Sequence, residues 1–90
     1  MHYRLELHKT FKKDIIKIKF SNEHYGRYIV YLASLLENKP LPPEALNHKL
    51  KGQWSDFMEF HVSGDLLVIY KIDENILQLV RIGSHSQLFD

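Results

Sequence analysis

The sequence predicts an α+β domain in which an antiparallel twisted sheet carries a helical hairpin on one face, in the order β-α-α-β-β-β. Apolar residues recur at helical spacing between residues 11 and 36, and three strand-like runs follow between residues 57 and 82. Short polar turns separate those runs, as in an antiparallel meander. The 90 residues are expected to form a single domain, residues 1–90, because this length supports one modest core.

The first half of the chain is expected to hold a short strand and two helices. Residues 3–8 alternate apolar and polar side chains, which is typical of a half-buried strand that can pair with an edge of the meander. Thr10 is the expected N-cap of the first helix, and Ser21 or Asn22 that of the second. The second helix is predicted to run to about Glu37, because the prolines that follow remove backbone donors.

The second half of the chain is expected to hold a long loop and then the meander. Residues 38–56 show no clear periodicity and are predicted as the loop. The three strands are predicted at residues 57–62, 66–72 and 76–82. The middle run is almost continuously apolar, which indicates a central strand that is buried on both faces.

The composition excludes several classes of protein. The chain has no cysteine, which excludes a disulfide scaffold, a thiolate zinc site and a cysteine nucleophile. No apolar run approaches the roughly 18 to 20 residues that cross a bilayer, and the N-terminus shows no signal-peptide core. We therefore expect a cytoplasmic protein without a membrane partner.

The net charge of +1 conceals an asymmetry between the two halves of the chain. Residues 1–40 carry eight Lys and Arg against four Asp and Glu, whereas residues 41–90 carry four against seven. The basic half can attract a polyanion such as RNA, or it can be a solvated helix surface. Charge alone leaves both interpretations open.

The second half also contains a candidate catalytic set, which consists of His48, His61, Asp65, Arg81 and His85. In metal-free RNA cleavage the ribose 2′-OH attacks the adjacent phosphorus. A base takes the 2′-OH proton, a cation stabilises the charged transition state, and an acid protonates the leaving 5′-oxygen. Histidines suit both proton transfers near neutral pH, an arginine can clamp the phosphoryl oxygens, and Phe89 or Tyr70 can stack on a base.

Each of these residues also has a structural interpretation. A histidine at a strand end is commonly a surface or core residue, Asp65 suits a turn, and Arg81 can pair with Glu59 or Asp65. Three histidines and an aspartate could also bind zinc, but no closely spaced histidine pair supports a metal site. We therefore expect neither a metal nor a cofactor.

Three stretches of the chain resemble the YafQ branch of the RelE/ParE toxin superfamily. They are His48-Lys49-Leu50-Lys51-Gly52-Gln53-Trp54, then Glu59-Phe60-His61-Val62-Ser63-Gly64-Asp65-Leu66-Leu67-Val68-Ile69-Tyr70, and finally Arg81-Ile82-Gly83-Ser84-His85-Ser86-Gln87-Leu88-Phe89. Their order and spacing carry the resemblance, which extends over the whole chain. It implies a RelE-like fold and a bacterial type II toxin that enters the A site of the 70S ribosome and cleaves mRNA there. It also implies a cognate antitoxin that silences the toxin, with a toxin–antitoxin heterotetramer as the expected assembly.

Matched position by position, the resemblance implies a role for each candidate residue. It places His48, His61, Asp65 and His85 in the catalytic set, with Arg81 on the phosphate and Phe89 as an aromatic residue that positions the mRNA. His85 is the implied general acid, and Asp65 or His48 the implied base with His61 assisting. Basic residues of the helices, among them Lys9, Lys12 and Lys13, are the expected RNA contacts.

The sequence departs from the family pattern at four positions. Lys49 and Gly64 stand where the pattern has prolines, Leu66 where an aromatic residue is sometimes found, and Met58 where an arginine is common. Two other functions therefore stay open. One is a non-enzymatic toxin that binds a protein target, as the gyrase-poisoning relatives do, although those generally lack this His and Asp set. The other is an inactive member that acts as an antitoxin-binding regulator.

Overall fold

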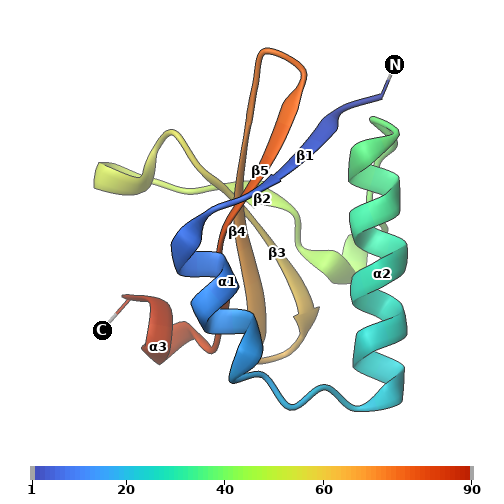
Figure 1. Cartoon of the computed structure of the whole chain (residues 1–90), viewed down its shortest axis with the longest axis vertical. Helices are drawn as coiled ribbons and strands as arrows, with labels where there is room; N and C mark the ends of the chain where they lie inside the picture. Colours follow the sequence, from blue (N-terminus) through green and yellow to red (C-terminus); the bar gives the residue numbers. More distant parts are fainter. Residues whose placement is uncertain (1, 90) are drawn as a thin grey trace.

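The computed structural model describes residues 2–89, so Met1 and Asp90, the two ends of the expected 1–90 domain, lie outside the described residues. The helices and strands follow the chain as β1 (Arg4–Leu7), α1 (Lys9–Ile16), α2 (Asn22–Leu36), β2 (His48–Lys49), β3 (Met58–Ser63), β4 (Leu66–Asp73), β5 (Ile76–Gly83) and α3 (His85–Phe89). Two short 3-10 helices, η1 (Pro43–Ala45) and η2 (Gly52–Trp54), flank β2. The α+β class is confirmed, with a twisted sheet at the centre (Figure 1).

The sheet has five strands in the order β1-β5-β4-β3-β2. The meander β3-β4-β5 is antiparallel, as predicted. The first strand also pairs with the edge of the meander, but β1 runs parallel to β5, so the sheet is mixed and not antiparallel throughout. No tight turn joins β1 to β5, because nearly the whole chain lies between them, and the connection therefore does not impose an antiparallel direction.

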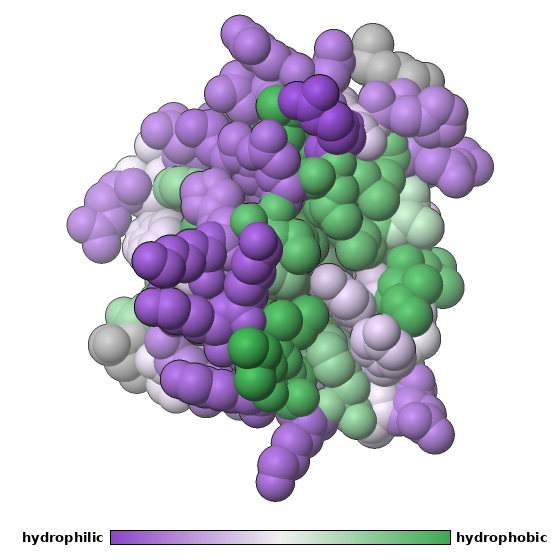
Figure 2. Space-filling model, in the orientation of Figure 1, coloured by the Kyte–Doolittle hydropathy of each residue, from purple (hydrophilic) through white to green (hydrophobic). Residues whose placement is uncertain are grey.

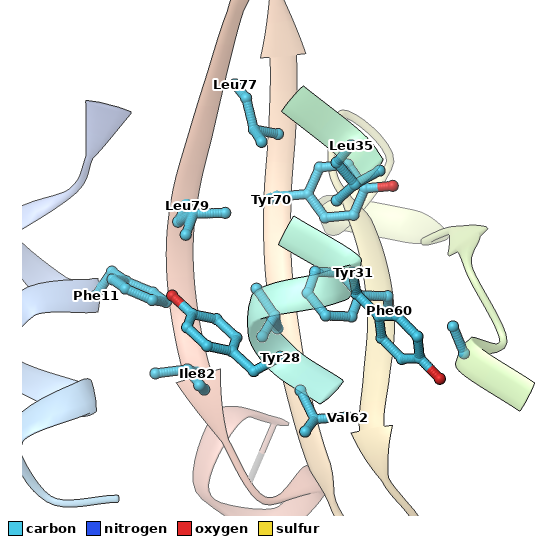
Figure 3. Packing of buried hydrophobic residues seen from close by; sticks show 12 residues of the cluster. Phe11, Tyr28, Tyr31, Leu35, Phe60, Val62, Tyr70, Leu77, Leu79 and Ile82 are labelled. Carbon is cyan, nitrogen blue, oxygen red and sulfur yellow. The ribbon is translucent and has the colours of Figure 1, made fainter. Parts of the chain in front are cut away.

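Both long helices cover the same face of the sheet. The helix α1 packs on β5, and α2 packs on β3. Their apolar side chains meet those of the strands in a core of aromatic and aliphatic residues (Figure 3). Phe11 of α1 and Tyr28 of α2 point toward one another there, and Phe60 of β3 contacts Tyr70 of β4 at a ring-centroid distance of 5.9 Å. The predicted helical layer on one face is confirmed.

The opposite face of the sheet is covered by the predicted long loop and by α3. The buried residues of this second cluster are Leu67, Ile69, Val80 and Leu88, against which Leu50, Trp54, Phe57 and Phe89 pack. Strand β4 contributes to both clusters, because Val68 and Tyr70 face the helices while Leu67 and Ile69 face away. The prediction that this strand is buried on both faces is therefore confirmed.

Helix α1 follows β1 and forms hydrogen bonds with the edge of β5 beyond the last paired residue of β1. β1 ends with Leu7 opposite Leu79, so the next residues of β5 pair with β4 on one side and have no strand neighbour on the other. The hydroxyl of Thr10 donates to the carbonyl oxygen of Val80 at 2.7 Å, and the backbone N–H of Ile82 donates to Asp14 at 3.2 Å. Thr10 was predicted to be the N-cap of α1, and this prediction is wrong. Its hydroxyl forms a hydrogen bond with the sheet edge and does not cap the helix.

The ends of α2 agree better with the sequence. Ser21 is the N-cap, and its hydroxyl oxygen accepts from the backbone N–H of His24 at 3.0 Å. The helix ends at Leu36, and Asn38 then adopts a left-handed backbone with φ of 58°. Within residues 2–89, no helix has both the length and the apolar character needed to cross a membrane.

Candidate active site

A hollow of about 410 Å³ lies on the sheet face that the long helices leave free. Its lining residues are His48, Lys49, Leu50, Lys51, Glu59, His85 and Phe89. Side chains of β3 alternate between the two faces, so Phe60 points into the helical core while Glu59 lies on the other side. The hollow therefore collects residues from β2, β3, α3 and the segment that follows β2.

A buried carboxylate joins two of the predicted histidines. Oε2 of Glu59 lies 3.0 Å from Nε2 of His48 and 3.5 Å from Nε2 of His61. His48 stands directly opposite Glu59 in the pairing of β2 with β3, and His61 follows Glu59 by two residues on the same face of β3. The two imidazole rings are 6.4 Å apart between centroids.

Burial makes Glu59 depend on these histidines. The residue is 5% exposed, and its Oε1 atom is buried without a hydrogen-bond partner among the described residues. A buried carboxylate is costly unless cations or hydrogen-bond donors face it. On the other side of the His48 ring, Nδ1 lies 2.6 Å from the carbonyl oxygen of Leu46. Both nitrogens of this ring thus face oxygen acceptors, which holds its orientation toward Glu59.

Glu59 is a residue of the site that the sequence alone does not predict, since its only expected partner is Arg81. A signal for it was present, because a carboxylate two positions from His61 in a strand must share the face of that histidine. The contact with His48 was not visible, since it depends on the register of the two-residue strand β2.

Asp65 and His85 also come together, through the backbone. Oδ1 of Asp65 accepts from the backbone N–H of His85 at 3.3 Å, which ties the turn after β3 to the start of α3. The His85 side chain is exposed, and its ring lies 4.9 Å from that of Phe89 between centroids. Phe89 in turn contacts Trp54 edge-on at 5.6 Å, so the loop supports the aromatic side of the hollow.

Arg81 is not among the residues that line this hollow. Its Nε atom donates to Oδ2 of Asp14 at 2.7 Å, and Nη2 donates to Oδ1 of the same carboxylate at 3.3 Å. These hydrogen bonds to Asp14 raise the pKa of Arg81, although partial burial opposes them. Asp14 is therefore the partner of Arg81, in place of Glu59 or Asp65 as the sequence suggested.

Arg81 and Asp14 line a second hollow, of about 250 Å³, together with Lys17, Ile18, Ile82 and Gln87. The helix α3 contributes to both hollows, because His85 and Phe89 line the first while Gln87 lines the second.

Tyr70 cannot serve as a stacking platform for a base. It is 1% exposed and faces the helical core. Its hydroxyl donates to Oδ1 of Asn47 at 2.5 Å, which anchors the segment immediately before His48. Burial raises the pKa of Tyr70 to about 12. Of the two aromatic candidates, Phe89 alone lines the hollow.

The predicted RNA-binding lysines and the hollow lie on different parts of the molecule. Lys9, Lys12 and Lys13 are exposed on α1, in the layer that covers the opposite face of the sheet. The lysines that line the hollow are Lys49 and Lys51. Within the described part of the chain, no group of three or more His, Asp or Glu side chains is arranged to hold a metal ion.

Known proteins are similar to this chain in sequence and in fold. The family model described as "Bacterial toxin of type II toxin-antitoxin system, YafQ" matches residues 3–90. The chain is 32% identical to the mRNA interferase toxin YafQ of Escherichia coli K12 over 87 residues, which cover 94% of each protein. It is 37% identical over 66 residues to a putative toxin YafQ of Haemophilus influenzae, which is 69% of this chain and 65% of that protein.

Two solved structures extend the likeness to the backbone. The E. coli DinJ-YafQ toxin-antitoxin complex superimposes with a TM-score of 0.86 at 26% identity, over 100% of both chains. A metal-bound toxin from Helicobacter pylori gives a TM-score of 0.83 at 39% identity, over 97% of this chain and 99% of that one. The chain therefore belongs to the YafQ family of bacterial toxins from type II toxin–antitoxin systems.

Proposed function

We propose that this chain is a ribosome-dependent mRNA endoribonuclease of the bacterial cytoplasm that cleaves RNA without a metal ion. The observation that carries the proposal is the hollow lined by His48, Glu59, His85 and Phe89, in which the carboxylate of Glu59 contacts His48 and also reaches His61. The naming of the E. coli relative as an mRNA interferase supports the same reaction. The site then needs a proton acceptor, a proton donor and cations for phosphate.

The cluster of Glu59, His48 and His61 is the proposed proton acceptor. It takes the proton of the ribose 2′-OH as the 2′-oxygen forms its bond to phosphorus. A carboxylate that faces two imidazoles orients both rings and stabilises the positive charge of the one ring that takes the proton. Asp65, whose carboxylate accepts from the His85 backbone, is the proposed anchor of α3.

His85 is the proposed general acid. Its exposed imidazole has no hydrogen-bond partner among residues 2–89, so both nitrogens are accessible to a substrate. It donates a proton to the 5′-oxygen as the bond from that oxygen to phosphorus breaks, which leaves a 2′,3′-cyclic phosphate and a free 5′-hydroxyl. The Phe89 ring beside it is the proposed surface on which a base of the mRNA stacks.

Two sets of lysines are proposed to contact RNA. Lys49 and Lys51 line the hollow and would face phosphates of the mRNA. Lys9, Lys12 and Lys13 of α1 lie in the helical layer, where ribosomal RNA is the RNA that they would meet. This division assigns substrate and ribosome to different sides of the domain.

A cognate antitoxin is the proposed protein partner, because the E. coli relative is found in a complex with DinJ. Apolar side chains are exposed on the helical face of the molecule (Figure 2). On α2 they are Tyr25, Ile29 and Val30, which are 50%, 48% and 60% exposed. We define these three residues as the α2 patch and propose that the antitoxin covers it, with a toxin–antitoxin heterotetramer as the assembly.

Primer extension on a model mRNA tests the proposed reaction. Purified protein is incubated with the mRNA in the presence and absence of 70S ribosomes, and the variants are His85→Ala and Glu59→Gln. His24→Ala, which changes a histidine of α2 far from the hollow, is the matched control. We expect cuts that require ribosomes, at rates that each site variant lowers by about 10²- to 10⁴-fold and the control does not change.

Three outcomes would each contradict a different part of the proposal. Folded wild-type protein that leaves the mRNA intact on ribosomes would point to a function in protein binding. Equal cutting of free mRNA would remove the dependence on ribosomes. A fully active His85→Ala variant would remove His85 from the reaction.

A further inference from the structure

The carboxylate of Asp14 accepts three hydrogen bonds from β5. Its Oδ2 accepts from Nε of Arg81 at 2.7 Å and from the backbone N–H of Ile82 at 3.2 Å, while Oδ1 accepts from Nη2 of Arg81 at 3.3 Å. The Asp14 side chain is 18% exposed. Asp14 and Arg81 are 67 positions apart in the sequence. Because Asp14 is also bound to the backbone N–H of Ile82, it holds the Arg81 guanidinium in place next to β5.

This arrangement leaves part of Arg81 unoccupied. An arginine has five N–H donors, of which Asp14 takes two. The side chain remains 30% exposed, and it lines the second hollow beside Lys17 and Gln87. The remaining donors therefore belong to a guanidinium of fixed position beside a hollow that solvent reaches, and α3 lines both this hollow and the one with His48 and His85.

We propose that Asp14 is a positioning residue, which orients the Arg81 guanidinium so that its remaining N–H groups meet the phosphoryl oxygens of the RNA. The proposal rests on the proposed endoribonuclease function. It is distinct from a simple attachment of α1 to the sheet, because Thr10 attaches the same helix to the same edge through Val80 without touching Arg81. In this role Asp14 acts on the reaction through Arg81.

The negative charge of Asp14 could help the reaction by orienting Arg81, or it could hinder the reaction by neutralising Arg81. A positioning carboxylate speeds the reaction, because a guanidinium that is already oriented needs no reorganisation in the transition state. A carboxylate that merely neutralised Arg81 would slow the reaction, and its removal would make the enzyme faster. The two possibilities therefore predict changes of opposite sign.

The test uses steady-state cleavage of mRNA on 70S ribosomes, with substrate in excess over the toxin, so that kcat and KM are determined separately. Asp14→Asn removes the charge at constant size, and Asp14→Glu is the conservative variant that restores it. Thr10→Val is the matched control, because it breaks the other bond between α1 and the edge of β5. Each variant is also combined with Arg81→Gln.

We expect Asp14→Asn to lower kcat by about 10- to 100-fold while KM stays within twofold, because misplacement of a catalytic group affects the transition state. Asp14→Glu should recover most of the rate, and Thr10→Val should change kcat by less than twofold. In the Arg81→Gln background, Asp14→Asn should have no further effect. A rise in kcat, an equal fall in Thr10→Val, or an undiminished effect in the Arg81→Gln background would overturn the proposal.

A second measurement does not depend on activity. The Nε–H proton of Arg81 is followed by NMR, and its exchange with water should be slow in the wild type and in Thr10→Val but fast in Asp14→Asn. Fast exchange in the wild type would overturn the positioning role, even if mRNA is cleaved. Slow exchange in a protein that cleaves no mRNA would instead show that the proposed function has failed while the Asp14 contact exists.

Discussion

The buried carboxylate of Glu59 organises the candidate site around itself. Because it is 5% exposed, its charge is not stabilised by bulk water and must be met by neighbouring side chains. His48 and His61 supply those neighbours from two strands, and they are held in return. The same contact thus satisfies a structural need and places two proton-transfer groups 6.4 Å apart between ring centroids.

The sequence predicted the surroundings of some site residues but not of others. The sequence context of Asp65 suits a turn, and Asp65 does lie in the turn between β3 and β4, where its carboxylate accepts from the backbone N–H of His85. Glu59 next to His48 and Asp14 next to Arg81 could not be predicted. Both contacts join segments whose relative position depends on strand register and on the packing of α1, and no local pattern encodes either of them.

We expect the free energy of unfolding to fall at high pH because of two buried side chains, Tyr28 and Tyr70. Burial raises the pKa of both side chains from 10.0 to about 12, and Tyr25 adds to the effect on Tyr28. The unfolded chain releases these protons near pH 10, whereas the folded chain keeps them to about pH 12. Their contribution is therefore fully present below pH 10 and is lost as the pH rises toward 12. Between those limits, the free energy of unfolding should fall by about 1.4 kcal/mol per pH unit for each tyrosine.

Urea unfolding at intervals from pH 9 to pH 11.5 measures this effect. Tyr70→Phe should remove about half of the slope that the two tyrosines cause, because one titrating group is gone. The variant should also lose about 1 kcal/mol at neutral pH, since the hydroxyl no longer reaches Asn47. A slope that is identical in the wild type and in Tyr70→Phe would contradict the assignment to Tyr70.

The shortest strand, β2, has the largest effect on the site. It spans His48–Lys49 and was expected as part of a loop, because two residues are too few for a periodic pattern. The backbone N–H of Leu50 extends the pairing to the carbonyl oxygen of Phe57, and the Tyr70 hydroxyl anchors Asn47 on the other side. Tertiary contacts, not local propensity, therefore create the element that carries His48.

The parallel pairing of β1 and the role of α1 have a similar cause. The residues of β1 were predicted to be a strand from their alternation, but its direction depends on a partner at the far end of the chain. The meander was predictable because its turns are short and local. Thr10 illustrates the limit, because a residue with the chemistry of an N-cap forms its hydrogen bond with the sheet edge instead.

The position of β2 leads to a prediction about salt dependence. If Lys49 and Lys51 hold phosphates of the mRNA, each lysine contributes about 0.7 to the slope of log affinity against log salt concentration for a single strand. Binding of a short single-stranded RNA is measured by fluorescence anisotropy between 50 and 200 mM KCl, in the His85→Ala background so that no cleavage occurs.

We expect Lys49→Gln with Lys51→Gln to make that slope shallower by about 1.4, because two phosphate contacts are lost. The matched control, Lys12→Gln with Lys13→Gln, removes the same charge from the exposed surface of α1. Its slope should stay near that of the parent. A shallower slope in the control alone would place the RNA strand on the helical side of the molecule.

The molecule as a whole presents two different faces. One carries the helices, which lie in front of the sheet in Figure 1, and the exposed α2 patch. The other carries the hollow, which is lined by two histidines and two lysines. The sheet separates them, since side chains of β4 pack to one side or the other. A protein that binds the α2 patch and an RNA that enters the hollow would therefore contact different elements.

This separation predicts that inhibition and cleavage can be uncoupled by one substitution. Val30→Glu places a charge within the α2 patch at a side chain that is 60% exposed, so folding should be little affected. The affinity of the cognate antitoxin, measured by calorimetry, should fall by about tenfold or more, because an unpaired charge would be buried in an apolar interface. Val30→Leu, which stays apolar, is the control and should bind as the wild type does.

The same variants are then assayed for cleavage of mRNA on ribosomes. Val30→Glu should cut at the wild-type rate and should need a higher antitoxin concentration for inhibition, since the hollow lies on the other face of the sheet. Unchanged antitoxin affinity would show that the antitoxin covers another surface. A loss of cleavage in Val30→Glu, with Val30→Leu fully active, would mean that the helical face takes part in positioning the protein on the ribosome. The two faces would then share one function.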